Sequence, residues 1–357
     1  MKKMTMSKTS RQNFITYAMV IVVYVIFQTL SATGNLSSLM QGLLVPLCTY
    51  SILAVSLNLT VGVLGELSLG HAGFMCVGAF SSAFFTACMK DTITNDLLRF
   101  ILAFVVAAVC AGICGILIGI PVLRLKGDYL AIVTLAFGEI IMNIINALYI
   151  GRDENGFHFS MKDSMSLNMS DGGKIIIKGA QGITGTARQS TFTIGIILLL
   201  LTLVVVLNLM NSRSGRAIMS IRDNRIAAES VGIDITKYKI MAFAISASLA
   251  GLAGCLYAHN LSSLTALPKN FGYNMSIMIL VYVVLGGMAN MRGSIIAAVL
   301  LTIIPELLRE IGEYRMLIYA VIMIVMMIFN WSPKVREWRK AHSIKGAFHK
   351  KNVKEAE

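Results

Sequence analysis

Long runs of apolar residues follow one another along most of this chain, separated by short polar segments. Each run is close to the ~20 residues that an α-helix needs to cross the ~30 Å hydrocarbon core of a membrane. The runs lie near residues 14–32, 40–60, 71–89, 97–123, 129–150, 191–210, 239–258, 273–288, 294–311 and 315–331. They lack the alternation of apolar and polar residues that marks a membrane strand, and a helix in lipid pairs its own backbone groups. The pattern therefore predicts an all-α fold, a polytopic membrane helical bundle of about ten transmembrane helices.

Two segments interrupt this pattern with glycine and polar residues, at 62–73 and at 286–293. They stand at corresponding positions in the two halves of the chain. Broken helices at corresponding positions are typical of inverted-repeat transporters. The alternative is a pair of tight cytoplasmic turns, because glycine is common at turns and between closely packed membrane helices. Both interpretations fit the residues.

The charged residues indicate how the bundle is oriented. The chain has 31 Lys and Arg against 18 Asp and Glu, a net charge of +13. Most of the basic residues fall in an N-terminal arm (1–13), a central segment (211–239) and a C-terminal tail (333–357), and counting ten spans puts all three on one side. Cytoplasmic segments carry such an excess, so the arm, the tail and both termini are expected in the cytoplasm, flanking a transmembrane domain at 14–332.

The basic excess also bears on partners. It is spread over loops and tails beside membrane spans, which favours anionic membrane lipid as a general partner. No basic domain stands apart from the spans, which argues against a nucleic acid partner. The first apolar run follows a basic arm and ends in small residues, as a signal peptide does, so its cleavage is an alternative. At residues 14–30 the run is longer than the apolar core of such a peptide.

The longest polar loop on the external side lies at 151–190. It exceeds ordinary connection lengths, so we expect it to be functional or partly disordered. Lys174–Lys178 is predicted to form a short strand, with turns at 171–173 and 179–182 on either side of it.

A polar, basic segment at 211–238 lies between two apolar runs. Its middle reads Asp-Asn-Arg-Ile-Ala-Ala-Glu-Ser-Val-Gly from Asp223 to Gly232. Asp223 is predicted to cap a short helix of about nine residues, which Gly232 ends in a left-handed conformation. A helix this short is marginal in water by itself, which favours insertion into a groove of another protein. The alternative is a solvated cytoplasmic loop.

One predicted span carries polar residues inside the membrane. Glu139 follows Asp128 by eleven residues, about 16 Å along a helix, which places it near the middle of the bilayer. Asn143 and Asn146 continue the same stripe, and His71 lies in the first glycine-rich break. An ionisable residue inside a membrane is a functional candidate by default, so these residues are predicted to line a substrate path. The alternative is structural, with Glu139 protonated or bonded to a neighbouring helix.

The sequence contains no recognisable catalytic, nucleotide-binding or metal-binding motif. All six cysteines lie in apolar runs, and none forms a Cys-x-x-Cys pair or a Cys/His cluster with metal spacing. Ser68 and His71 lack an orienting acid that the sequence could place. We therefore expect a protein that is not an enzyme and that needs no metal or cofactor.

Several stretches resemble a known family of membrane proteins. They are Gly-Glu-Leu-Ser-Leu-Gly-His-Ala-Gly-Phe at 65–74, the block from Arg124 to Ile140, Gly-Ile-Thr-Gly at 182–185, and Ser-Arg-Ser-Gly-Arg at 212–216 with the following helix. In these stretches the chain is similar to LivM-type permeases, the membrane subunits of ABC importers for branched-chain amino acids. The resemblance runs from about residue 40 to residue 310, and the block at 124–140 is its most specific part.

The resemblance implies an assembly in the bacterial inner membrane. It would contain a second, homologous permease, two cytoplasmic ATP-binding subunits and an extracytoplasmic amino-acid-binding protein. In such importers an ATP-binding subunit grips a cytoplasmic loop with a Glu-Ala-Ala-x-x-x-Gly pattern, and here Ile226 stands where the pattern has Glu. The residues that the resemblance places in this coupling loop are Arg216, Arg222, Asp223, Ala227, Ala228, Glu229 and Gly232.

The resemblance also implies a substrate and a mechanism. Leucine, isoleucine and valine would cross the membrane as the ATP-binding subunits close and the coupling loop moves the helices at 191–210 and 239–258. One alternative is a related ABC permease for urea or short amides, which would share the membrane motifs. A second is an ion-coupled secondary amino acid transporter, against which the short basic helix argues.

Overall fold

The structure, a computed structural model, describes residues 8–34, 36–90, 92–122, 125, 127–153, 156–169, 173–308 and 314–331. The start of the N-terminal arm (1–7), Arg124, Lys126 and the tail at 333–357 lie outside the described residues. The chain divides into two compact units, residues 1–299 and 300–357. The first unit holds all the candidate site residues.

Helices account for most of the described chain, as the apolar runs predict. Seven helical stretches among the described residues are long and apolar enough to cross a membrane. They are α1 (Lys8–Ala32), α2 (Ser38–Asn58) with its continuation η1 (Leu59–Leu64), α3 (His71–Cys88), α4 (Asp96–Val122), α5 (Asp128–Ala147), α6 (Phe192–Asn211) and α9 (Ile235–Ala258). The chain is a multi-pass helical membrane protein, and the predicted fold class is confirmed.

The last three predicted spans form shorter helices. These are α11 (Tyr273–Gly286), α12 (Met291–Leu307) and α13 (Arg315–Trp331), with 14, 17 and 17 residues. Each lies within or over the apolar run that predicted it. Because about 17 residues is the lower limit for a helical span, the membrane crossing of these three stays a prediction.

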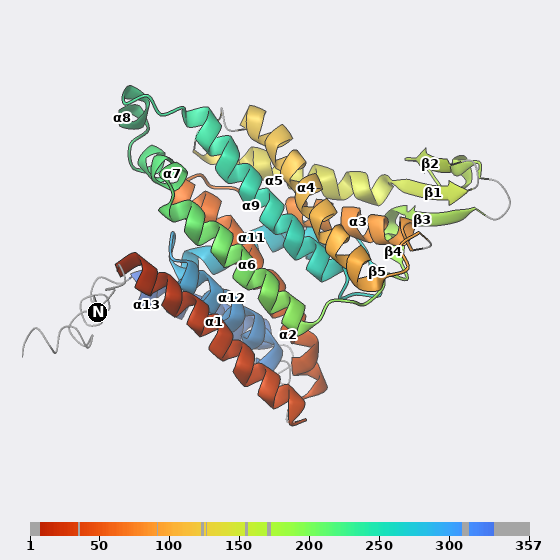
Figure 1. The fold of residues 1–357 in the computed structure, drawn as a ribbon, viewed down its shortest axis with the longest axis horizontal. Helices are drawn as coiled ribbons and strands as arrows, with labels where there is room; N and C mark the ends of the chain where they lie inside the picture. The colour runs from red at the N-terminus through yellow and green to blue at the C-terminus, as the bar shows by residue number, and fades with distance from the viewer. Residues whose placement is uncertain are drawn as a thin grey trace, which may run out of the picture. The chain divides into compact units, whose positions relative to one another are not determined.

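Helices α2 and α9 form the centre of the first unit. Helix α2 packs against α6, α9 and α11, and α9 lies between α4 and α6 (Figure 1). Small residues let α9 approach its neighbours closely, since a Cβ atom on Gly254 would lie only 2.1 Å from the carbonyl oxygen of Met75 on α3. Close approach of this kind is how helices associate in lipid, where no hydrophobic force drives them together.

The predicted external loop contains a small antiparallel sheet. Strand β1 (Tyr149–Asp153) pairs with β2 (Gly156–Ser160) and with β3 (Lys174–Lys178), in the order β2-β1-β3. The strand predicted at Lys174–Lys178 is confirmed, whereas β1 and β2 were not predicted. Strand β1 occupies the end of the run predicted as a span to residue 150, because α5 already ends at Ala147.

A second pairing ties this loop to the bundle. Strand β4 (Ile183–Thr184) pairs with β5 (Ser263–Leu264), which follows α9 and precedes the short α10 (Pro268–Phe271). Gly182 has φ +68°, and a Cβ there would lie 1.9 Å from the Leu264 carbonyl oxygen, so glycine is required. Figure 1 shows the strands at one end of the first unit and α7 (Arg213–Asp223) with α8 (Arg225–Ser230) at the other.

Candidate functional site

The two glycine-rich breaks lie against each other. Asn58, at the end of α2, donates from Nδ2 to Ser294 Oγ at 2.8 Å, and its Oδ1 accepts from the Ala289 N–H at 2.8 Å. A Cβ on Gly62 would lie 1.9 Å from Asn58 Oδ1 and 2.2 Å from Ala289 N. We name these four residues the Gly62 junction. Helix α2 and the turn between α11 and α12 therefore meet with no room for a side chain at Gly62.

The first break begins later along the chain than predicted. After Asn58 the helix continues as the π-helical turn η1, which ends at Gly65 with φ +81°. Gly62 therefore lies inside helical structure, and the irregular backbone covers only 65–70 before α3 starts. Single π-helical turns within longer helices are frequent at functional sites.

Arg222, near the end of α7, reaches the Gly62 junction. Its Nη1 donates to the Gly62 carbonyl oxygen at 3.0 Å. Its aliphatic carbons lie against Gly65, where a Cβ would come within 2.6 Å of Arg222 Cγ. Asp223 orients the guanidinium, because Arg222 Nε and Nη2 donate to Asp223 Oδ1 at 3.0 and 2.9 Å. The basic segment thus contacts the break directly.

A second contact joins the end of the basic segment to the same break. Lys239, in the second turn of α9, forms an ion pair with Glu66, which directly follows Gly65. The two side chains are only 4% and 17% exposed. Removing one partner of a buried pair is costly because it leaves the other charge uncompensated. Arg222 and Lys239 therefore hold the middle and the end of the basic segment against η1 and the two residues that follow it.

The basic segment folds as two helices, where one was predicted. Helix α7 has 11 residues and α8 has six. They are separated by Asn224, whose backbone is extended and whose side chain accepts from the Ala227 N–H at 3.1 Å. The prediction that Asp223 caps this helix was wrong, since Asp223 ends α7. Asn and Asp are equally good caps, so propensity alone does not choose between these neighbours.

The end of α8 follows the prediction. Gly232 is left-handed, with φ +82°. Its N–H donates to the Glu229 carbonyl at 3.0 Å, and the Ile233 N–H donates to the Ala228 carbonyl at 3.1 Å. These two hydrogen bonds form a Schellman motif. Ala228 is buried in a small cluster with Ile221, which holds α8 against α7.

The remaining face of this segment is exposed. Arg216, Ala227 and Glu229 are exposed, and Arg216 donates to the carbonyl of the last α6 residue. Ile226 and Val231 are 81% and 75% exposed. Two large apolar side chains on an otherwise polar segment favour contact with a partner. Neither was predicted as a site residue, although two branched apolar residues among charged ones were visible in the sequence.

Two of the predicted path residues on α5 bond outside their own helix, one to the start of α11 and one to the segment before it. Glu139 Oε1 accepts from the Tyr273 N–H at 2.6 Å, and Asn146 Nδ2 donates to the Ala266 carbonyl at 2.8 Å. A carboxylate at the first turn of a helix is favoured by the helix dipole. Exposed Asn143 donates to the Glu139 carbonyl of its own helix at 2.8 Å. Glu139 and Asn146 thus hold α5 to its neighbours, and their role on a path stays a prediction.

His71 begins α3 and is 2% exposed. Its Nε2 lies 2.7 Å from Ser56 Oγ on α2, and the next N–H, of Ala72, donates to Ser276 Oγ on α11 at 3.1 Å. The start of α3 is therefore held to two neighbouring helices. In the part of the chain that the structure describes, no three metal-ligating side chains come together.

A many-helix membrane bundle whose broken helices meet beneath an exposed basic segment is typical of a transport permease. The family described as "Branched-chain amino acid transport system / permease component" matches residues 39–329. The chain belongs to this family of permease components.

Individual proteins similar to this chain include permeases of the same class. The chain is 35% identical over 294 residues to the high-affinity branched-chain amino acid transport system permease protein LivM of Salmonella typhimurium, covering 80% of this chain and 67% of the relative. It is 34% identical to LivM of Escherichia coli over the same shares of the two chains. A weaker likeness, 24% over 155 residues, links 40% of the chain to 44% of the fructose import permease protein FruG of Bifidobacterium longum. No solved structure matches the chain significantly.

Proposed function

We propose that this chain is the membrane permease subunit of an ATP-driven importer for leucine, isoleucine and valine. The observation that carries this proposal is the family match over residues 39–329. Because a fructose permease is a more distant relative, the substrate needs its own test. The test is uptake of labelled leucine by proteoliposomes that contain the assembled importer. We expect competition by isoleucine and valine, and competition by urea alone would favour the short-amide alternative.

We further propose the assembly around the permease. A second, homologous permease would lie beside it in the bacterial inner membrane, with two cytoplasmic ATP-binding subunits, one of them docked at α7 and α8, and an amino-acid-binding protein at the sheet end. ATP hydrolysis would take place on the ATP-binding subunits. The basic residues near α7 and α8 support a cytoplasmic position for this end. Mass spectrometry of the complex purified from native membranes tests the assembly, and a chain that purifies alone would favour a secondary transporter.

For coupling, we propose a route through the Gly62 junction. Helix α8 would dock into an ATP-binding subunit, and α7 would carry its displacement to the carbonyl of Gly62 through Arg222. The junction joins α2 to the turn between α11 and α12, so one displacement would reach helices from both halves of the chain. Rigid helices that rock about such a point are the usual means of alternating access.

Replacing Arg222 by alanine should uncouple hydrolysis from transport. The substitution removes a charge-assisted hydrogen bond worth about 1.5–3 kcal/mol, which corresponds to a loss of about 10- to 100-fold in leucine uptake per ATP hydrolysed. Both rates are measured on the same proteoliposomes. The control is Arg213→Ala, because Arg213 is exposed on the same helix. An unchanged ratio of uptake to hydrolysis in Arg222→Ala would rule out the route.

Replacing Glu139 by glutamine separates the two roles of this residue. Glutamine keeps an acceptor for the Tyr273 N–H but removes the charge, so the link between α5 and α11 survives. If the carboxylate faces the amino group of the substrate, the KM for leucine should rise about tenfold or more. The lost charge at the first turn of α11 should cost only about 0.3–1 kcal/mol of stability, a small decrease in melting temperature. Unchanged transport kinetics would leave Glu139 with the structural role alone.

A further inference from the structure

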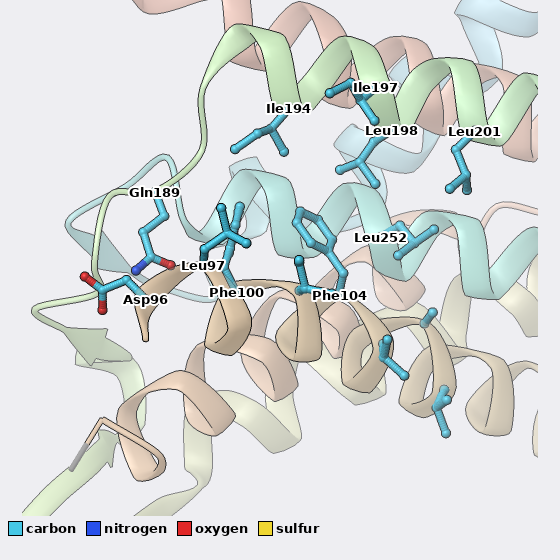
Figure 2. Close-up of a pocket in the computed structure, with 14 residues that line it drawn as sticks. Asp96, Leu97, Phe100, Phe104, Gln189, Ile194, Ile197, Leu198, Leu201 and Leu252 are labelled. Atoms are coloured by element: carbon cyan, nitrogen blue, oxygen red, sulfur yellow. The ribbon is translucent and has the colours of Figure 1, made fainter. Parts of the chain in front are cut away.

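The sheet formed by β1, β2 and β3 carries large apolar side chains that lie outside the membrane-spanning helices. Exposed apolar residues are ordinary along the spans, where they meet lipid, and Leu97 of α4 and Ile197 of α6 are examples (Figure 2). On the sheet, Phe159 of β2 is 66% exposed, and Met161, directly after β2, is exposed to the same extent. Large apolar side chains that gather outside the spans indicate an interaction surface.

Strand β1 is fixed to the ends of two spans. It begins at Tyr149, two residues after α5 ends at Ala147. Near its other end, Arg152 Nη1 donates to the carbonyl oxygen of Cys88, the last residue of α3, at 3.0 Å. A strand tied at both of its ends to the ends of spans runs along the membrane surface and not away from it. The sheet therefore lies at the level of the lipid headgroups, which extend about 5–8 Å beyond the hydrocarbon core on each side.

The register of the sheet shows to which side Phe159 points. Phe159 lies opposite Ile150, and directly opposed residues of an antiparallel pair share one face of the sheet. Phe157 lies on this face too, opposite Arg152. Ile150 is buried in the main core cluster, and the ring of Phe157 lies 5.9 Å from that of Phe84, in the last two turns of α3. This face therefore covers the bundle, and Phe159 continues it on the edge strand.

The same face carries two like charges opposite each other. Arg152 pairs in register with Lys174 of β3, an arrangement that destabilises a strand pair by itself. Lys90, after α3, lines one pocket together with both of them. The acidic residue in this lining, Asp153, has a side chain that is only 1% exposed and that pairs with His158. The pocket therefore presents positive charge at headgroup level, which suits the phosphate groups of lipid.

We propose that this face of the sheet rests on the lipid surface. Phe159 inserts between the headgroups, and the basic residues of the pocket lie beside lipid phosphates. An inserted aromatic ring next to basic residues is typical of segments that bind in the membrane interface. A protein that docks from outside the membrane meets the opposite face of β2, which carries His158 and Ser160. The lipid contact fixes the position of the sheet over the ends of α3 and α5.

Photo-crosslinking in native membranes tests the position of Phe159. p-Benzoylphenylalanine replaces Phe159 in the full-length chain, and the crosslinked products are identified by mass spectrometry. We expect a phospholipid adduct on the peptide that contains residue 159. The same replacement at Ser160, on the opposite face of β2, is the control and should give no lipid adduct. A crosslink from position 159 to another subunit, no crosslink there, or equal lipid adducts at both positions would overturn the proposal.

Tryptophan fluorescence of the full-length protein in vesicles is a second measurement. Phe159→Trp is made in a chain whose two tryptophans, Trp331 and Trp338, are replaced by phenylalanine. In vesicles of phosphatidylcholine and phosphatidylglycerol, a lipid with a spin label near its headgroup should remove most of the emission, and aqueous iodide should remove little. Ser160→Trp, the matched control, should show the reverse. Quenching of Phe159→Trp by iodide and not by the labelled lipid would contradict the assignment.

Discussion

Replacing Gly62 by alanine should destabilise the protein by about 3 kcal/mol and abolish leucine uptake, although it adds a single methyl group. The new Cβ would lie 2.2 Å from the Ala289 backbone nitrogen and 1.9 Å from Asn58 Oδ1. Relieving the overlap separates α2 from the α11–α12 turn and breaks the hydrogen bonds that Asn58 makes there. Buried polar groups then lose their partners, which adds to the cost of overpacking.

The measurement is the thermal midpoint of the purified protein in detergent, together with uptake by the reconstituted importer. Gly42→Ala is the matched control, because Gly42 lies in the same helix and no atom lies within 4 Å of its Cβ position. Alanine is the better helix former, so this control should retain full uptake and equal or slightly higher stability. If Gly62→Ala had the same stability and uptake as Gly42→Ala, the inference that the Gly62 junction has no room for a side chain would be wrong.

The helical part of this fold was predictable because a membrane imposes one strong rule on sequence. Runs of about 20 apolar residues must form helices in lipid, so even the short α11 and α12 appear where their apolar runs lie. The details within a helix follow weaker rules. The helix continues past Gly62 to Leu64 as a π-helical turn. Nothing in the residues after Asn58 predicts such a turn. We interpreted the glycine at position 62 as a sign of a broken helix, but glycine is also required where two helices pack closely, as Gly62 does here.

The polar segments show the limits of local reasoning. Gly232 was predictable as a left-handed residue because glycine strongly prefers the position after a helix end. The division at Asn224 was not, because Asp223 is an equally good cap. Strand β1 was read as the end of a span, since Tyr149 and Ile150 continue the apolar run before the polar residues of the strand.

The contacts that form the candidate site could not be predicted from the sequence, because they join residues far apart along the chain. Arg222 and Gly62 are separated by 160 positions, and Lys239 and Glu66 by 173. A single sequence identifies each of these residues as polar or small but carries no information on pairing at such distances. The predicted motion of the helices at 191–210 and 239–258 stays a prediction, and the contact of α7 with η1 is a further connection that the sequence did not indicate.

Replacing Gly232 by arginine should abolish uptake without preventing insertion of the chain into the membrane. At φ +82° a residue with a Cβ costs about 1–2 kcal/mol, which a folded bundle tolerates. No atom of the chain lies within 4 Å of the Cβ position, so the side chain does not overlap the bundle. It follows exposed Val231 at the end of α8, the helix proposed to enter the ATP-binding subunit. Loss of a contact at the centre of an interface costs about 2–4 kcal/mol, or about 30- to 1,000-fold in affinity.

Uptake and co-purification of the ATP-binding subunits measure this effect together. Gly34→Arg is the control for backbone strain, because Gly34 has φ +71° and open space around its Cβ position, in the turn between α1 and α2. The predicted topology puts that turn on the external side, so the control should insert, bind the ATP-binding subunits and transport. Loss of uptake in both variants would assign the defect to strain. Normal uptake in Gly232→Arg would show that α8 does not couple hydrolysis to transport, and the contact of Arg222 with Gly62 would then be structural.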